Sequence, residues 1–413
     1  MLLVCAGIPA WSLELWHDPD TGRYGELQTT LKLTGHGDYN PDDAWLFPKR
    51  YRLTGLARAR LDLTMRLSDS VTAEVAYEHR ARHNTPGGAA GMGGDALAAF
   101  APAPWRIATL DWQLARDRER FAWRHEIDRA RVQIRRDWGT ITAGRQAIGF
   151  GRGMIFSAVD VFAPFSPVEV DREWRRGVDA LRIEYQTTAL SSLEMVAVFG
   201  NRWDASALLA RFRGYVGEID GEIIVGKRGR DAMFALVMSA VVGDAAVHGE
   251  LAFFHTPERR ADAGLFGGKR VTEKLVLGAS HTFDVGRGLT VLGEYHYSGF
   301  GLKNAGDATR RFRDRQFVER YMRGDSQILG QHGMALQASY PITDTVTGGF
   351  LLLGSLRDGS GLASPSLTWI ASQTTTMAFH AFVPWGASPR RGRLRSEYGA
   401  SPRSVLAQVS LYF

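Results

Sequence analysis

The sequence lacks most features that mark helical membrane proteins and multidomain soluble proteins. Its 413 residues contain no apolar run of about 18 residues, so a protein that crosses a membrane with helices is excluded. Proline-rich linkers, charge blocks and repeats of about 40 to 50 residues are also missing, which favours one large unit and argues against a propeller. The net charge of +6 is modest for this length and gives no reason to expect a nucleic-acid partner.

Cysteine is almost absent. Cys5, the single cysteine, lies in the apolar start MLLVCAGIPAWS, which is typical of the end of a secretory signal peptide. We assign residues 1–12 to a signal peptide remnant whose charged beginning lies upstream. A lipoprotein with a lipidated Cys5 is the weaker alternative, because Val4 is large for the residue before a lipidated cysteine. Residues 13–413 then have no cysteine, which excludes disulfides, thiolate metal sites and attached c-type haem; we expect no cofactor and no metal.

Alternation with period two is present along most of the chain. Residues 53–65 carry an apolar or small residue at every odd position, whereas the even positions include arginine, aspartate and threonine. Such a strand has one apolar and one charged face. The same pattern recurs over about eighteen segments between Leu27 and Phe413. We therefore predict an all-β fold, a transmembrane antiparallel barrel of about eighteen strands formed by residues 13–413.

The connections between the predicted strands alternate in length. Short turns, such as those at 68–70 and 137–139, follow the even-numbered strands, whereas the long connections follow odd-numbered ones. Bacterial outer-membrane barrels have this asymmetry, with short periplasmic turns and long extracellular loops. A soluble sandwich or barrel is the alternative, but eighteen strands would enclose a lumen too wide to fill with side chains. We therefore expect the apolar face to meet lipid and lipopolysaccharide.

The last segment, 403–413, alternates and ends on Phe413. Amphipathic terminal strands that end in phenylalanine resemble the signal by which the barrel assembly machinery receives its clients. The segment therefore predicts a bacterial outer-membrane location and assembly machinery as a partner.

Residues opposite the apolar row would line water, and many of them are arginines. We do not expect these arginines on the lipid face, because an arginine there near the bilayer midplane destabilises the barrel by roughly 2–4 kcal/mol. A ladder of guanidinium groups favours anions through bidentate hydrogen bonds, although pairing with nearby Asp and Glu could equally brace the wall. The candidate lining residues are Arg58, Arg60, Arg129, Arg131, Arg135, Arg182, Arg211 and Arg213.

The segment 150–175 is unusually apolar for a connection and contains glycines, prolines and several aromatic residues before a charged cluster. We predict that this loop folds into the barrel and narrows the channel, with a self-capped surface loop as the alternative. Its candidate constriction residues are Asp160, Phe162, Phe165, Asp171, Arg175 and Arg176. Residues 105–123 are predicted to include a short amphipathic helix.

The motif GTITAGRQAIGFG, followed by REWRRGVDALRIEY, resembles the alginate-export family of outer-membrane barrels over about 125–186. The matching residues are Gly144, Arg145, Gln146, Asp179, Ala180 and Arg182. The resemblance implies an eighteen-stranded channel with an arginine-lined constriction for an anionic polymer. It singles out Arg129, Arg131, Arg145 and Arg182, and so adds Arg145 to the candidate lining residues.

The leading functional hypothesis is passive transport of anionic solutes, or of an anionic polysaccharide, through a water-filled pore. A structural barrel that sheathes a multihaem cytochrome is the alternative; the haem would then come from a periplasmic partner, because the chain has no Cys-x-x-Cys-His motif. An enzyme is not expected. Ser280 and His281 are adjacent and so face opposite sides of a strand, which separates a hydroxyl from its base.

Overall fold

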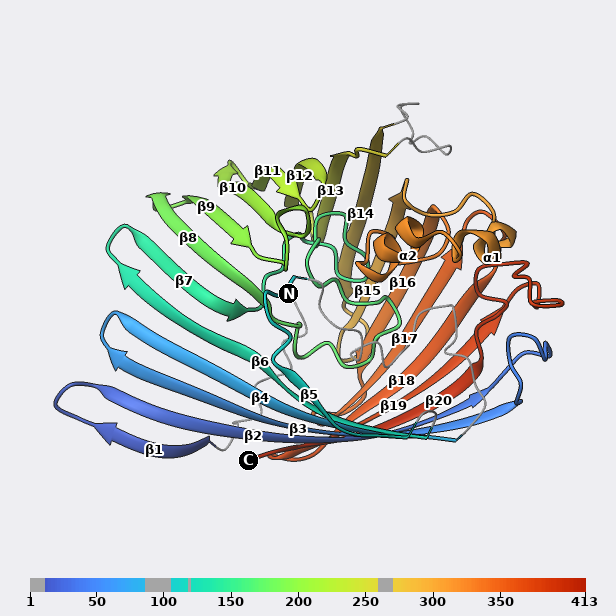
Figure 1. The fold of residues 1–413 in the computed structure, drawn as a ribbon, viewed down its shortest axis with the longest axis horizontal. Coiled ribbons are helices and arrows are strands. Elements are labelled where there is room, and N and C mark those ends of the chain that lie inside the picture. The colour runs from blue at the N-terminus through green and yellow to red at the C-terminus, as the bar shows by residue number, and fades with distance from the viewer. Residues whose placement is uncertain (1–11, 86–104, 118–119, 259–269) are drawn as a thin grey trace.

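The computed structural model describes residues 12–85, 105–117, 120–258 and 270–413. Twenty strands form one antiparallel sheet, and two of them, β1 (Ser12–Asp18) and β5 (Asp111–Asp117), pair with a single neighbour each. The other eighteen form a ring that closes where β2 (Arg23–Tyr39) pairs with β20 (Arg403–Tyr412), for example Leu31 with Leu411. The predicted all-β barrel of eighteen strands is confirmed (Figure 1).

The remaining strands follow one another around the ring in chain order. They are β3 (Tyr51–Ser68), β4 (Val71–Asn84), β6 (Phe121–Arg136), β7 (Gly139–Gln146), β8 (Val178–Thr188), β9 (Ser191–Val198), β10 (Ala207–Val216), β11 (Ile219–Arg228), β12 (Asp231–Val242), β13 (Ala245–His255), β14 (Val271–Phe283), β15 (Leu289–Ser298), β16 (His332–Pro341), β17 (Val346–Ser355), β18 (Gly361–Ser372) and β19 (Thr375–Trp385).

The two faces of the wall differ as the alternation predicts. Outward residues such as Leu53 and Val405 expose 64% and 63% of their surface, whereas the inward Arg58 exposes 5%. An apolar outer face of this extent is stable against hydrocarbon and not against water, and each of the eighteen ring strands has a paired neighbour on both sides, so the ring itself has no open edge in lipid. Among the described residues, no helix is long and apolar enough to cross a membrane.

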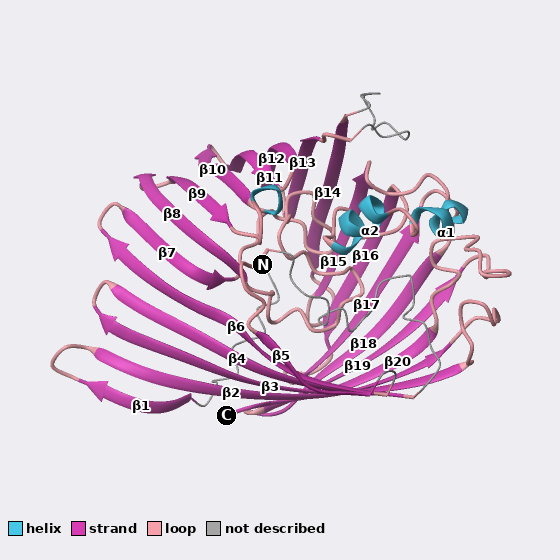
Figure 2. Ribbon diagram, in the orientation of Figure 1, coloured by secondary structure: helices cyan, strands magenta, loops and turns pink. Residues whose placement is uncertain are grey.

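Tight turns join the strands at one end of the barrel, and most long connections lie at the other. The turns include 69–70, 137–138 and 373–374. The long end carries α1 (Ala308–Arg311) and α2 (Arg315–Met322), which lie together at the upper right in Figure 2. A short 3-10 helix, Trp203–Ala205, precedes β10 and another, Ala305–Asp307, precedes α1.

Two additions to the ring were not predicted. β1 pairs with the first half of β2, beyond the end of β20. β5 pairs with the first half of β6, and the short β7 pairs with the second half of β6. β5 therefore continues the wall beside β6 beyond the point where β7 ends, at the end of the barrel with the long connections. The expected helix within 105–123 is therefore wrong for its central part: residues 111–117 form a strand because an open edge of β6 is available to them.

Chain closure involves the last residue. Phe413 donates its backbone N–H to the carbonyl of Thr29 at 2.8 Å and accepts the Thr29 N–H at 2.9 Å. The predicted signal remnant, 1–12, lies outside the described residues except for Ser12, where β1 begins.

Candidate functional site: a charged lumen crossed by a loop

The connection between β7 and β8, residues 147–177, lies inside the barrel and is visible as the green chain in the middle of Figure 1. Two wall carboxylates hold its first half. Glu250 on β13 accepts the backbone N–H groups of Gly153 and Ala158, each at 2.6 Å. Glu294 on β15 accepts those of Met154 at 2.6 Å and Phe156 at 2.9 Å. Charged acceptors of this kind form stronger hydrogen bonds than neutral ones, so the loop is firmly attached to this wall.

Apolar contacts add to this attachment. Phe156, Val159, Val161 and Phe162 expose at most 2% of their surface and belong to one apolar cluster with inward residues of β8 to β15. The ring of Phe156 stacks on that of His296, with centroids 4.8 Å apart. The first half of the loop is thus a lining on one inner wall and does not hang free.

The second half of the loop is fastened to the opposite wall. Asp171 forms an ion pair with Lys32 on β2 at 2.7 Å and another with Arg58 on β3 at 3.1 Å. In the ring, β3 and β13 are nine strands apart out of eighteen, so they face each other. The loop therefore crosses the lumen. We name residues 171–177, its last part, the strap.

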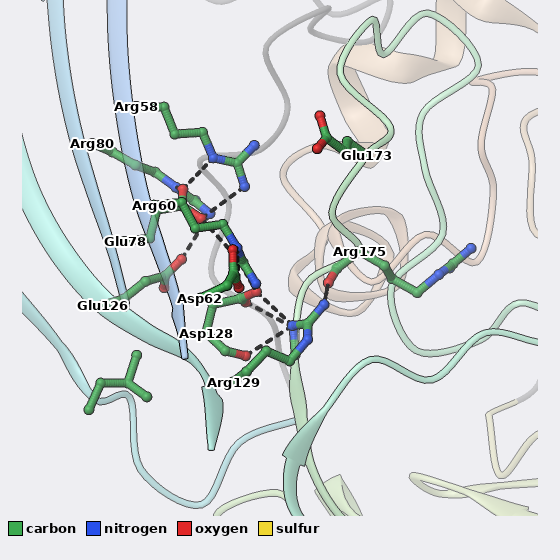
Figure 3. Close-up of polar contacts among 12 residues, drawn as sticks. Arg58, Arg60, Asp62, Glu78, Arg80, Glu126, Asp128, Arg129, Glu173 and Arg175 are labelled. Carbon is green, nitrogen blue, oxygen red and sulfur yellow. Dashed lines mark hydrogen bonds and ion pairs between the residues drawn. The ribbon is translucent and has the colours of Figure 1, made fainter. Parts of the chain in front are cut away.

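Behind the strap lies a dense network of opposite charges on β3, β4 and β6 (Figure 3). Glu78, with no exposed side-chain surface, pairs with three guanidinium groups, those of Arg58, Arg60 and Arg80. Asp128 receives Arg60 at 3.0 Å and Arg129 at 2.6 Å. Buried charges are stable only when paired in this way, so the network braces the wall.

The network depends on an irregularity of β6. Asp128 and Arg129 are consecutive, yet both belong to the inward network, because the register with β4 shifts between Ala76 and Tyr77. An extra residue in one strand of a pair is a β-bulge, and it lets two neighbours face the same side. The backbone N–H of Gly177 donates to Asp128 at 3.0 Å, so the bulge also receives the end of the strap.

Other predicted arginines are more accessible and lie closer to the short-turn end. Arg131 and Arg182 each expose 33% of the side chain, and Arg213 exposes 36%. Arg135 is also exposed. Arg211 is less so, and it bridges Glu194 at 2.8 Å and Glu222 at 3.0 Å. Both predicted roles of the inward arginines therefore occur, at different positions along the barrel axis: some brace the wall, and others are exposed to the lumen.

Arg145 is placed differently from the other predicted residues. Its guanidinium donates to Asp179 at 2.7 Å and to the carbonyls of Thr109 and Ile127 at 3.1 and 2.8 Å. Only 1% of the side chain is exposed. Arg145, near the end of β7, is therefore enclosed in the wall and covered by the segment that precedes β5. It takes no part in the lumen lining that we propose.

The predicted loop residues fall into two groups. Asp160 and Phe162 are buried; Arg175 pairs with Asp160, which opposes the rise that burial causes in the pKa of Asp160. Phe165 lies under the guanidinium of Arg175, 4.8 Å from its ring centroid. Asp171 and Arg176 are half-buried in the strap. The structure thus brings Asp160, Phe165 and Arg175 together, whereas Asp171 is bound to the opposite wall.

Sequence reasoning missed four residues of this region: Lys32, Arg80, Arg106 and Trp174. Lys32 and Arg80 lie on the even, inward positions of their strands, so the alternation could have found them. Arg106 precedes β5 and pairs with Glu126 at 3.1 Å and with Asp128 at 3.2 Å, a position that no pattern indicates.

A further unpredicted feature is the contrast between the two sides of the lumen. The strands β16 to β19 contain no Asp, Glu, Lys or Arg, and β20 has only Arg403 at its outer end. Their inward positions are mostly Ser, Thr, Gln, Leu and glycine, as the pairings Gln337–Leu351 and Ser366–His380 illustrate. By the same count around the ring, this uncharged wall faces β7 to β10, which carry Arg182, Arg211 and Arg213, across the lumen.

No protein-family model matches this chain, and no curated protein matches its sequence. Solved structures do match. A double-substituted variant of OccD1 (OprD) superposes with a TM-score of 0.50 at 10% identity, covering 94% of each chain. OccAB4 from Acinetobacter baumannii gives 0.54 at 9% identity, covering 94% of this chain and 97% of that one. The chain thus has the fold of an outer-membrane porin barrel, and the alginate-export resemblance stays a prediction.

Proposed function

We propose that the protein is an outer-membrane channel through which small anionic solutes diffuse passively. The observation that carries this proposal is the set of inward guanidinium groups of Arg131, Arg135, Arg182 and Arg213, on β6, β8 and β10, which are at least one-third exposed or classed as exposed. Such groups lower the energy of an anion in a narrow, partly desolvated passage more than in bulk water. The apolar outer face and the porin fold support the location in lipid.

The guanidinium groups of this lining share their carboxylates. Arg182 and Arg211 share Glu194, and Arg152 and Arg213 share Asp220. Arg152 and Arg211 also pair with Glu222, and Arg182 lies 3.9 Å from Glu184, so these four arginines meet four carboxylates. The exposed Arg135 adds positive charge to this balanced set, which supports a preference for anions over cations.

The test is reversal potential in a planar bilayer under a salt gradient. We expect the wild-type channel to be anion-selective, and a variant with Arg131→Gln, Arg135→Gln, Arg182→Gln and Arg213→Gln to lose most of that selectivity. Arg287→Gln is the matched control, because Arg287 lies in a turn and pairs with Asp344 away from the lumen. A cation-selective wild type would contradict the anion preference, and absence of conductance would contradict the channel.

The larger cargo that the sequence suggests is an anionic polysaccharide. An extended chain of linked uronic acids would have to pass between the loop and the uncharged strands, where Ser, Thr and Gln offer hydrogen bonds to its hydroxyls. Block of the ionic current by an oligouronate, and none by a neutral oligosaccharide of equal length, would support this cargo. The crossing loop favours a channel over a cytochrome sheath, since a cytochrome in the lumen would have to displace it.

A further inference from the structure

The strap covers a group of cations on the barrel wall. Lys32 and Arg58 are paired neighbours on β2 and β3, and Arg60 lies two residues from Arg58 on the same face. Their side chains expose only 2% to 5%, because the strap lies over them. Figure 3 shows Arg58 and Arg60 on the wall and Glu173 of the strap on the facing side.

The strap supplies carboxylates to the cations of β2 and β3. Among the described residues, Lys32 forms ion pairs only with Asp171 at 2.7 Å and Glu173 at 2.5 Å, both in the strap. Arg58 shares the wall carboxylate Glu78 with two other guanidinium groups, whereas Arg60 also pairs with Asp62 and Asp128 on the wall. Without the strap, Lys32 would therefore lose both of its ion-pair partners and Arg58 would keep only the shared Glu78, at a site where unpaired buried charge is costly.

The strap also supplies an aromatic ring. The indole of Trp174 lies 4.0 Å from the ammonium of Lys32, 4.7 Å from the guanidinium carbon of Arg58 and 5.0 Å from that of Arg60, measured to a ring centroid. Cations at these distances are attracted by the negative face of a ring. Three cations thus meet one indole and two carboxylates, a combination of ring and negative charge that an anion with a planar ring would also supply.

We propose that Lys32, Arg58 and Arg60 are the binding site for an aromatic carboxylate, and that Asp171, Glu173 and Trp174 occupy this site as a tethered imitation of that ligand. This inference rests on the proposed function and narrows its substrate class. A solute carboxylate replaces the strap carboxylates on Lys32 and Arg58, and its ring replaces the indole. The strap must move aside when the solute binds.

Competition between strap and solute sets the expected affinity. A segment tethered close to its site acts at an effective concentration in the millimolar range or above, so a solute competes only at comparable concentration. Weakening the strap should therefore strengthen solute binding. If Asp171 and Glu173 themselves bound the solute, the same change would weaken its binding instead.

The experiment measures binding of benzoate to the purified, detergent-solubilised protein by calorimetry. We expect the double variant Asp171→Asn, Glu173→Gln to bind benzoate about tenfold more tightly than the wild type, and Lys32→Gln added to that variant to reverse most of the gain. Cyclohexanecarboxylate has a similar size and no aromatic face, and should bind several-fold more weakly than benzoate. The matched charge control is Glu218→Gln with Asp244→Asn, two exposed carboxylates in tight turns away from the strap.

Equal benzoate affinity in the wild type and the strap variant would overturn the tethered imitation, and equal affinity for the two acids would overturn the aromatic specificity. Both variants are first checked for the folded barrel by heat-dependent migration on gels. Calorimetry does not require conduction, so a closed channel that binds benzoate refutes only the proposed function. An anion-selective channel that binds no benzoate refutes only the site.

Discussion

Glu250 on the barrel wall accepts the backbone N–H of Ala158 at 2.6 Å, although 92 residues separate the two along the chain. The other carboxylate oxygen of Glu250 accepts the N–H groups of Arg152 at 2.5 Å and Gly153 at 2.6 Å. One side chain thus satisfies backbone donors at both ends of a loop segment that has no regular secondary structure. A buried segment needs such acceptors, because unpaired N–H groups cost free energy.

Glu250→Gln should loosen the loop. Glutamine keeps one acceptor oxygen but turns an NH2 group toward backbone donors, so half of the hydrogen bonds are lost and the charge with them. We expect a higher mean single-channel conductance, by about twofold, and more frequent steps between current levels. Bilayer recordings check this against Glu218→Gln, an exposed carboxylate in the turn between β10 and β11. Indistinguishable traces from the two variants would show that Glu250 does not hold the loop.

Asp128→Asn should destabilise the barrel more than loss of a typical surface charge. Asp128 is 1% exposed and pairs with Arg60, Arg106 and Arg129, so the variant leaves three buried guanidinium groups short of an anion. Breaking a buried pair from one side costs roughly 3–5 kcal/mol. Urea unfolding followed by Trp fluorescence measures the effect. Asp69→Asn, whose carboxylate is 90% exposed, is the control, and an equal loss in both variants would contradict the bracing role.

The general architecture could be predicted from the sequence because it depends on a periodic property. Lipid outside and water inside impose alternation on every strand, and a single residue of slippage would reverse both faces. The turns could be predicted for a related reason, since the tight ones consist of short polar or glycine-containing segments. Local patterns of this kind carry enough information to count strands without any knowledge of their neighbours.

The site depends on contacts that no local pattern contains. Strict alternation cannot place Asp128 and Arg129 on the same face; a bulge opposite Ala76 and Tyr77 does so. The pairing of Lys32 with Asp171 joins residues 139 positions apart, and the sequence shows only that each is charged. Arg145 matches a family motif, yet the segment before β5 encloses it in the wall. Irregular strands and long-range ion pairs were therefore beyond sequence reasoning.

Gly144→Ala should impair barrel assembly. Gly144 has φ of +114°, and a Cβ there would lie 2.2 Å from the carbonyl oxygen of Ala130 on the paired strand. Both the backbone conformation and the clash oppose any side chain. We expect most of the variant to migrate as unfolded protein on unheated gels. Gly293→Ala, where a Cβ would have no neighbour within 4 Å, should assemble normally. Equal assembly of the two would contradict the close strand approach at Gly144.

The connection after β19, residues 386–402, should open as pH rises through neutrality. Glu397 is 5% exposed and accepts the N–H groups of Leu329 at 2.8 Å and Gly330 at 3.2 Å. Burial, together with the nearby Asp358, raises the pKa of Glu397 from 4.5 to about 7, although the two N–H donors oppose the rise. Between those two values the folded loop holds a proton that an opened loop releases, so stability falls as pH increases.

The shift corresponds to roughly 3 kcal/mol of lost stability once pH exceeds 7, which is large for one loop. Four exposed arginines, Arg390, Arg391, Arg393 and Arg395, make the same loop a substrate for trypsin when it opens. The measured quantity is the cleavage rate of the wild type divided by the rate of Glu397→Gln at the same pH, which removes the pH dependence of trypsin itself. We expect this ratio to be several-fold higher at pH 8 than at pH 6. Glutamine cannot ionise, so its loop should open equally at both values. A ratio that does not change with pH would mean that Glu397 stays in one protonation state throughout.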